Sequence, residues 1–263
     1  MLLTGKERVA ICGMRTEPGS FYTRAMLHSG TNVCCGISKD PTAKDMFTDF
    51  PVFSSVREAY TNNPFDILIV YDYPKNVKDR VIEALMVGVP WIIIGTDHVP
   101  LLDMVIIRQK LALSKSQILG PSSSGILIPG RGAFGAVSTL DYGKRSGLGV
   151  ISRSESLIIM LLDTFGVGFS QVLDIGSDPV LGMDTNVALD YLMNDPETKQ
   201  VLVMAVKESA LEDIPYPKPV FCMIVGEDED RDFKHIEKIT SLTYLKRLGR
   251  KERTNEKRNT KSD

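Results

Sequence analysis

The stretch Gly149-Val-Ile-Ser-Arg-Ser-Glu-Ser156 predicts a strand, a tight turn and the start of a helix. Its β-branched pair favours a strand, and the apolar residues after the serines recur at helical spacing. Ser154 stands where a helix N-cap is expected, which makes Glu155 the first helical residue. The first turn of a helix has unpaired N–H groups and the positive end of a dipole, so it is a natural anion site.

Glu155 decides whether that anion site is still available. A carboxylate there stabilises the helix by roughly 0.3–1 kcal/mol. A phosphate of charge about −2 a few Å away would be repelled by about 4 kcal/mol per unit charge at a surface-like dielectric. Because the repulsion is larger, we expect Ser152, Ser154 and Glu155 to be the remnant of an anion site.

The composition is typical of a globular protein with one or two domains: 263 residues, 43% hydrophobic and 24% charged, with net charge −2. No apolar run approaches the roughly 20 residues of a membrane span. Only Met1 to Lys6 precede the first expected strand, which leaves no room for a targeting sequence and predicts a cytoplasmic location. The alternative is a mitochondrial location, if the numbered chain is already processed or is imported without a cleaved presequence. The four cysteines lack metal or redox spacing and are expected to be buried free thiols.

Strands alternate with helices along the chain, which predicts an α/β fold with parallel, doubly wound sheets. The first six strands are expected at Arg8–Cys12, Val33–Ile37, Pro51–Phe53, Asp66–Tyr71, Trp91–Ile94 and Ile118–Pro121. Four more are expected at Leu148–Ile151, Gln171–Ile175, Val201–Val206 and Val220–Val225, with a helix over Phe233–Leu248 after them. The predicted domains are residues 1–145 and 146–245, followed by a flexible tail, 246–263.

The tail carries eight basic residues from Lys246 onward against three acidic ones. Such a segment is typically solvated and disordered. The alternative is an electrostatic contact with nucleic acid or with an acidic protein partner.

Several short motifs occur in one order between about Arg8 and Val225. They include Pro51-Val-Phe53, Val99-Pro100, Gly120-Pro121, Ile151-Ser-Arg-Ser154, Asp178-Pro179 and Asp195-Pro196. In this order they resemble the alpha subunit of succinyl-CoA ligase, a family that forms a thioester through a phosphohistidine. The resemblance implies a Rossmann-like CoA-binding domain, a flavodoxin-like second domain that is truncated here, and a beta-type partner subunit.

The resemblance also implies a CoA site. The family's first turn, G-x-T-G-x-x-G, keeps Gly13 and Gly19 here, but its centre reads Arg15-Thr-Glu17. The family's Gly-Pro-Asn-Cys-Pro-Gly loop reads Gly120-Pro-Ser-Ser-Ser-Gly125, and Lys39 and Lys44 flank the position of its lysine. The implied cofactor-binding residues are therefore Gly13, Arg15, Gly19, Lys44, Pro121 and Ser122. The central glycine of the motif is lost, and Glu17 adds a negative charge. We therefore expect that no cofactor binds, and CoA is the one cofactor for which the question stays open.

The family's nucleophile motif, Gly-His-Ala-Gly-Ala, has no counterpart in this sequence. His235 is nearest to its place but is expected on an amphipathic surface helix, and Glu208 stands one residue from the orienting carboxylate, which becomes Lys207. His98 and His28 are interpreted as structural. Without the motif, no histidine is expected to carry the phosphoryl group during covalent transfer. We therefore assign no catalytic residue and no metal-binding residue.

Three functional hypotheses remain open. The first is a catalytically degenerate alpha-like protein, a pseudoenzyme that serves as a structural subunit beside a beta-type or other protein partner. The second is a working succinate–CoA ligase alpha-type subunit, ADP- or GTP-forming, or a CoA sensor. The third is a nucleic-acid- or ribosome-associated protein that binds through the tail.

Overall fold

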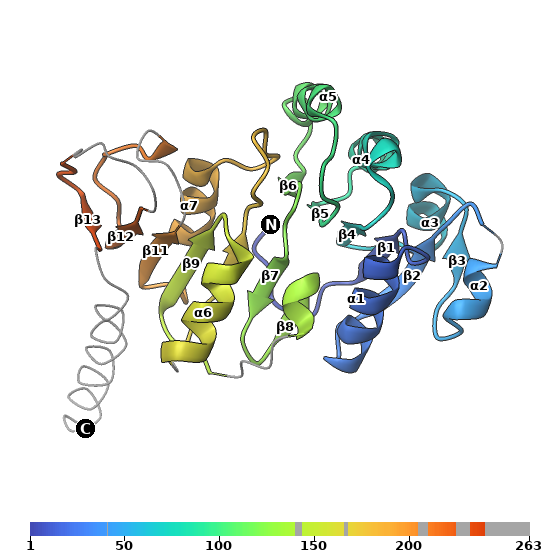
Figure 1. Ribbon diagram of the computed structural model, residues 1–263, viewed down its shortest axis with the longest axis horizontal. Helices are drawn as coiled ribbons and strands as arrows, with labels where there is room; N and C mark the ends of the chain where they lie inside the picture. The colour runs from blue at the N-terminus through green and yellow to red at the C-terminus, as the bar shows by residue number, and fades with distance from the viewer. Residues whose placement is uncertain (41, 140–143, 166–167, 205–209, 225–231, 240–263) are drawn as a thin grey trace. The chain divides into compact units, whose positions relative to one another are not determined.

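The computed structural model describes residues 1–263 except 41, 140–143, 166–167, 205–209, 225–231 and 240–263 (Figure 1). The chain forms two compact units. The first comprises Met1–Leu127, Arg131–Asp141 and Asp174–Met183, and the second comprises the remainder. The domain boundary predicted at residue 145 stays a prediction, and the tail 246–263 lies outside the described residues.

The first sheet has six strands in the order β3-β2-β1-β4-β5-β6, all paired in parallel. The strands are β1 Val9–Cys12, β2 Val33–Ile37, β3 Val52–Phe53, β4 Ile67–Val70, β5 Trp91–Ile94 and β6 Gln117–Leu119. The strand order reverses between β1 and β4, and ligands of such sheets bind at this switch point, beyond the carboxyl ends of the strands. This confirms the predicted Rossmann-like fold.

Five helices connect these strands: α1 Glu17–His28, α2 Ala43–Met46, α3 Val56–Asn62, α4 Pro74–Val87 and α5 Leu101–Leu111. Their ends follow from local chemistry. Thr16 and Ser55 cap α1 and α3 through their hydroxyl oxygens. Helix α4 begins at Pro74, which is preorganised for the first helical position, and ends at Val87, with Gly88 as its C-cap at φ of 79°.

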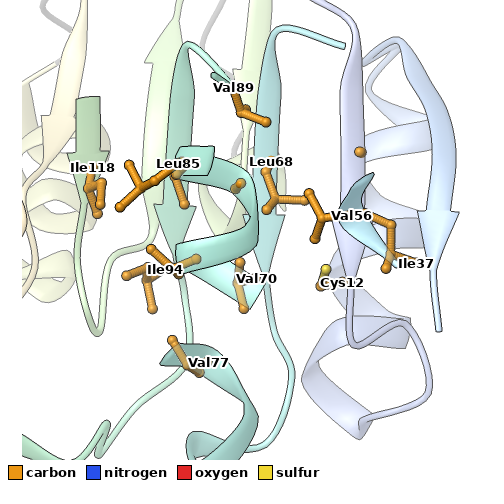
Figure 2. Packing of buried hydrophobic residues seen from close by; sticks show 14 of the residues in the cluster. Cys12, Ile37, Val56, Leu68, Val70, Val77, Leu85, Val89, Ile94 and Ile118 are labelled. Atoms are coloured by element: carbon orange, nitrogen blue, oxygen red, sulfur yellow. The ribbon is translucent and has the colours of Figure 1, made fainter. Parts of the chain in front are cut away.

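The core of the first unit lies where β4 and β5 pack against α4. The runs Ile67–Val70 and Trp91–Ile94 are fully buried, as expected for strands covered on both faces. Figure 2 shows Val77 and Leu85 of α4 gathered over Val70 and Ile94. Burying each such side chain contributes roughly 1.5–3 kcal/mol, so this cluster holds the switch point in place.

A hairpin follows β6 that the sequence did not predict. It consists of β7 Gly125–Ile128 and β8 Gly132–Phe134, with the 3-10 helix η1 Ala136–Thr139 after it. Three residues join the two strands, a link that is long enough only for an antiparallel pair.

The second sheet has the order β13-β12-β11-β9-β10-β7-β8. Its remaining elements are β9 Leu148–Ser152, β10 Val172–Asp174, β11 Gln200–Met204, β12 Val220–Met223, β13 Ile236–Lys238, α6 Glu155–Phe165 and α7 Thr185–Met193. Strands β9, β11, β12 and β13 pair in parallel. Because the hairpin also belongs to it, the sheet is mixed, whereas the sequence predicted parallel pairing throughout.

Strand β13 stands where the sequence predicted the start of a helix over Phe233–Leu248. Ile236 pairs with Val220 and is buried, while Glu237 next to it is exposed. The edge of β12 therefore overrides the helical pattern, and the helix prediction is wrong for residues 233–239. Residues 240–248 lie outside the described part of the chain.

The helices in the described part of the chain are all too short or too polar to cross a membrane.

Candidate functional site: a charged cleft at the switch point

A cleft of about 580 Å³ opens beyond the carboxyl ends of β1, β2 and β4. The turn after β1, the loop after β2 and one side of α4 line it. Its volume falls within the roughly 300–1,000 Å³ of small-molecule sites. The switch point thus holds a cavity large enough for a nucleotide-sized ligand.

Two glycines shape the turn after β1. Gly13 has φ of 83°, and a Cβ there would lie 2.4 Å from the backbone nitrogen of Asp72. A Cβ on Gly19 would lie 2.1 Å from the carbonyl oxygen of Gly13. Gly13 lines the cleft and Gly19 packs behind it. Close packing of the turn and α1 accounts for both glycines, so they carry no information about a phosphate.

The N-terminus of α1 offers few donors to a ligand. The Gly19 N–H donates to Thr16 Oγ1 at 3.0 Å, and the Ser20 N–H donates to the Thr16 carbonyl at 2.9 Å. Pro18 has no N–H. The N–H group of Glu17 is the remaining donor of the first turn. The side chain of Glu17 is exposed and is not part of the cleft lining. The first turn of α1 therefore contributes little to phosphate recognition in this cleft.

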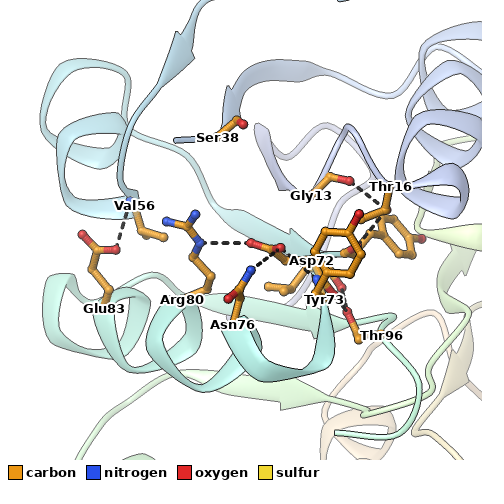
Figure 3. A network of polar contacts seen from close by, with 12 residues as sticks. Gly13, Thr16, Ser38, Val56, Asp72, Tyr73, Asn76, Arg80, Glu83 and Thr96 are labelled. Carbon is orange, nitrogen blue, oxygen red and sulfur yellow. Dashed lines mark hydrogen bonds and ion pairs between the residues drawn. The ribbon is translucent and has the colours of Figure 1, made fainter. Parts of the chain in front are cut away.

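The floor of the cleft is a buried ion pair (Figure 3). Asp72 Oδ2 lies 3.3 Å from Arg80 Nε, and the two residues are 9% and 8% exposed. Asp72 Oδ1 accepts from the Tyr73 N–H at 2.8 Å and from Asn76 Nδ2 at 2.9 Å. The Asp72 carboxylate thus fixes the start of α4. The sequence analysis missed this network, although Asn76 and Arg80 stand four residues apart on one helix face.

Glu83 occupies the N-terminus of α3. Its carboxylate accepts from the Val56 N–H at 3.2 Å and from the Arg57 N–H at 3.0 Å, and Figure 3 shows it reaching across from α4. Ser55 Oγ accepts from the Glu58 N–H at 3.1 Å. The chain itself therefore satisfies the helix end that borders the cleft.

The rim of the cleft carries a salt bridge between Arg15 Nη1 and Asp40 Oδ2 at 2.8 Å. Asp40 Oδ1 accepts from the Thr42 N–H at 2.9 Å and from Thr42 Oγ1 at 2.7 Å. These Thr42 hydrogen bonds, and then Arg15, hold the pKa of Asp40 below its usual value, so the carboxylate is charged at neutral pH. Lys39 also lines the cleft and is exposed. Lys44, on α2, is not part of the lining.

The thiol nearest the cleft is inert. Cys12 ends β1, is fully buried, and has its pKa raised to about 12 by burial, against a lowering by Arg80. It is therefore a neutral thiol at physiological pH and no nucleophile. The four cysteines are all free thiols, as predicted, but Cys34 is half-buried, whereas the sequence predicted that all four are buried.

The serine turn after β6 hydrogen-bonds to the last residue of β10 and to the loop that follows it. Ser122 Oγ donates to Asp178 Oδ1 at 2.6 Å, and the Ser124 N–H and Oγ donate to Asp174 Oδ2 at 2.8 and 2.7 Å. The Gly120–Pro121 peptide is cis. Neither Pro121 nor Ser122 belongs to the cleft lining, so the structure does not bring them together with Arg15.

The predicted anion remnant lies in the second unit. Helix α6 begins at Glu155, and the Leu157 N–H approaches Ser154 Oγ at 3.4 Å, as an N-cap requires. Ser152 Oγ accepts from the Ser154 N–H at 3.0 Å and donates to the Ser154 carbonyl at 3.1 Å. The predicted helix start is confirmed, and the two serines hydrogen-bond to each other.

The chain has three histidines, and none of them lines the cleft. His28 is exposed at the end of α1, and His98 is exposed in a turn with φ of 57°. His235 lies in a bend before β13, not on a helix, and its N–H donates to Asp213 Oδ1 at 2.9 Å. Glu208 lies outside the described residues. Within the described ranges, no group of three or more potential ligands is placed to hold a metal ion.

Comparison with known proteins agrees with this geometry. The family model for the CoA binding domain matches residues 4–98, which include the whole cleft lining. The alpha 1 subunit of an ADP-forming succinate–CoA ligase from Archaeoglobus fulgidus is 32% identical over 235 residues, covering 86% of this chain and 80% of that protein. A subunit of an ADP-forming sulfoacetate-CoA ligase from an Acholeplasma species is 30% identical over 211 residues, covering 78% and 71%.

Solved structures share the fold. ATP citrate lyase from Methanothrix soehngenii, in complex with citrate and coenzyme A, superposes with a TM-score of 0.67 at 12% identity, over 92% of this chain and 45% of that one. PH0766 from Pyrococcus horikoshii gives a TM-score of 0.65 at 16% identity, over 86% and 54%. This chain thus spans about half the length of these solved chains.

Proposed function

This chain belongs to the family of succinate–CoA ligase alpha subunits, and we propose that it is a nucleotide-binding alpha-type subunit that does not carry a phosphoryl group. In this proposal it works beside a beta-type partner as a non-catalytic member of an assembly. The observation that carries the nucleotide-binding part of the proposal is the cleft at the switch point, which holds Arg15, Lys39 and Arg80.

The absence of a carrier is what separates this proposal from an active ligase. A phosphoryl group that is passed through a protein needs a nucleophilic side chain to hold it. The chain's three histidines are distributed over a helix end, a turn and the bend before β13. None is flanked on both sides by glycines, which would let a loop close around a phosphate.

The cleft supports retention of a ligand. Asp72 and Arg80 are charged groups kept almost wholly out of water beside an open cavity. Burying such a pair costs several kcal/mol per ion in solvation, so it is weak evidence for stability and fits a site better than a core. Arg15 and Lys39 supply positive charge at the rim, where a diphosphate group would lie.

Phosphorylation tests the proposal directly. The full chain would be incubated with γ-labelled ATP and the beta subunit of the Archaeoglobus fulgidus ligase, with that enzyme's own alpha subunit as the positive control. We expect acid-labile phosphate on the control and none on this chain. Stoichiometric acid-labile label would overturn the proposal, and His98→Asn and His235→Asn variants would show where the label resides.

A working ligase subunit is the second candidate, because the relatives at 30% and 32% identity are ligase subunits. It would need His98 or His235 to accept phosphate, and the same labelling experiment decides it. A nucleic-acid partner for residues 246–263 stays a prediction, because the tail lies outside the described residues.

A further inference from the structure

The cleft is more acidic than a site for a polyanion should be. Its lining contains three cationic and four acidic side chains: Arg15, Lys39, Arg80, Asp40, Asp72, Asp79 and Glu83. Arg80 is engaged by Asp72 and Arg15 by Asp40. Lys39 is then left with Asp79 and Glu83, so the lining as a whole carries one negative charge in excess.

We propose that this cleft prefers a nucleotide with a diphosphate and an unphosphorylated ribose, and that it discriminates against the 3′-phosphate of CoA. The inference rests on the proposed function in one respect, that the cleft is the nucleotide site. It deepens that function by naming the ligand class. Dephospho-CoA belongs to this class and differs from CoA by the ribose phosphate alone.

Asp40 is the residue that discriminates. It stands just beyond β2, about 20 residues after Gly19, where a carboxylate of a Rossmann-like fold accepts hydrogen bonds from ribose hydroxyls. Thr42 and Arg15 hold it in one place, and the same contacts keep it charged at neutral pH. Thr42 donates two hydrogen bonds to Oδ1 and Arg15 pairs with Oδ2, so one of the roughly four acceptor sites of the carboxylate remains for a ribose hydroxyl. A ribose phosphate, with charge of about −2, meets the same carboxylate as a like charge.

The N-termini of α1 and α3 do not compensate for this repulsion. Pro18 and the Thr16 cap leave α1 with little donor capacity, and the carboxylate of Glu83 occupies the start of α3. Arg15 and Lys39 at the rim are the remaining cations that are not buried. Asp40 already offsets the charge of Arg15, which leaves Lys39 as the main cation for a diphosphate group, and the described lining holds no second phosphate site.

Isothermal titration calorimetry of the full chain with CoA and with dephospho-CoA tests the proposal. We expect dephospho-CoA to bind at least about tenfold more tightly, a difference of about 1.4 kcal/mol. In the Asp40→Asn variant, the ratio of the dissociation constant of CoA to that of dephospho-CoA should fall to about one, because the variant binds CoA more tightly. Asp49→Asn makes the same change of charge at an exposed position outside the cleft and should keep the wild-type ratio.

The outcomes separate the two proposals. If CoA binds the wild type as tightly as dephospho-CoA, or if the preference survives in Asp40→Asn, discrimination by Asp40 is wrong and the nucleotide site stands. If neither ligand binds, the nucleotide site itself is wrong and the discrimination falls with it. Circular dichroism and the melting temperature of each variant show whether a loss of binding is a loss of fold.

Discussion

Arg80 Nε lies 3.3 Å from Asp72 Oδ2 at the floor of the cleft, and both residues are more than nine-tenths buried. The pair joins the end of β4 to the second turn of α4. It therefore links the strand that ends at the switch point to the helix that forms one wall of the cleft.

Replacing Arg80 by methionine should destabilise the protein by about 3–5 kcal/mol, because the Asp72 carboxylate is left buried without a counter-charge. Urea unfolding followed by circular dichroism measures this. Arg57→Met is the matched control, since Arg57 is exposed, and should stay within about 0.5 kcal/mol of wild type. A loss below about 1 kcal/mol for Arg80→Met would mean that water screens the pair.

Gly13 and Gly30 have almost the same backbone, with φ of 83° and 82°, but different surroundings. A Cβ on Gly13 would meet the Asp72 backbone, whereas nothing lies within 4 Å of one on Gly30. Gly30→Ala should therefore lower the free energy of unfolding by about 1–2 kcal/mol, the strain of an alanine in the left-handed region. Gly13→Ala should cost clearly more, with a correspondingly lower melting temperature. Equal melting temperatures would show that the turn after β1 moves away from β4 without cost.

Cys34 should be the most reactive of the four thiols near neutral pH. The hydrogen bond with Cys35, opposed by burial and assisted by Arg8, lowers the pKa of Cys34 to about 7, and the same hydrogen bond raises the pKa of Cys35. The thiolate is the nucleophile, so alkylation of Cys34 should rise with pH around a midpoint near 7. Iodoacetamide labelling with peptide mass spectrometry measures the profile. Arg8→Gln should move the midpoint upward; an unchanged midpoint would remove Arg8 from the explanation.

Glu83→Ala should destabilise the protein by about 1–2 kcal/mol, because two N–H groups at the start of α3 lose their acceptor. Asp79 lies on the same helix and lines the same cleft, but it is exposed. Asp79→Ala should therefore change the free energy of unfolding by less than about 0.5 kcal/mol. Urea midpoints compare the two. If both variants are neutral, water replaces the Glu83 carboxylate at the helix end.

Much of the fold could be predicted from local sequence. The unbroken apolar runs of β4 and β5 are typical of strands buried on both faces, and Ser154 marks the start of α6 by capping chemistry alone. The failure at β13 has a physical cause. Three residues are too few for a periodic pattern to separate strand from helix, and pairing with β12 decides the outcome.

The chemistry of the cleft was less accessible from sequence. Gly13 and Arg15 were expected there and do line it, whereas Lys39 lines it in place of Lys44. Glu83 binds backbone groups 26 and 27 residues earlier in the chain, a pairing that only the packing of α4 against α3 creates. Local motifs carry no signal for such contacts between elements.

Pro18 has a consequence that extends beyond α1. A cradle of backbone N–H groups holds a phosphate at fixed geometry, whereas solvated side chains are screened over a Debye length of about 8 Å at physiological ionic strength. With Pro18 removing one donor and Thr16 using another, occupancy of the cleft rests on Arg15 and Lys39. The affinity of the cleft for a nucleotide should therefore fall as the salt concentration rises, as it does on an ion-exchange resin.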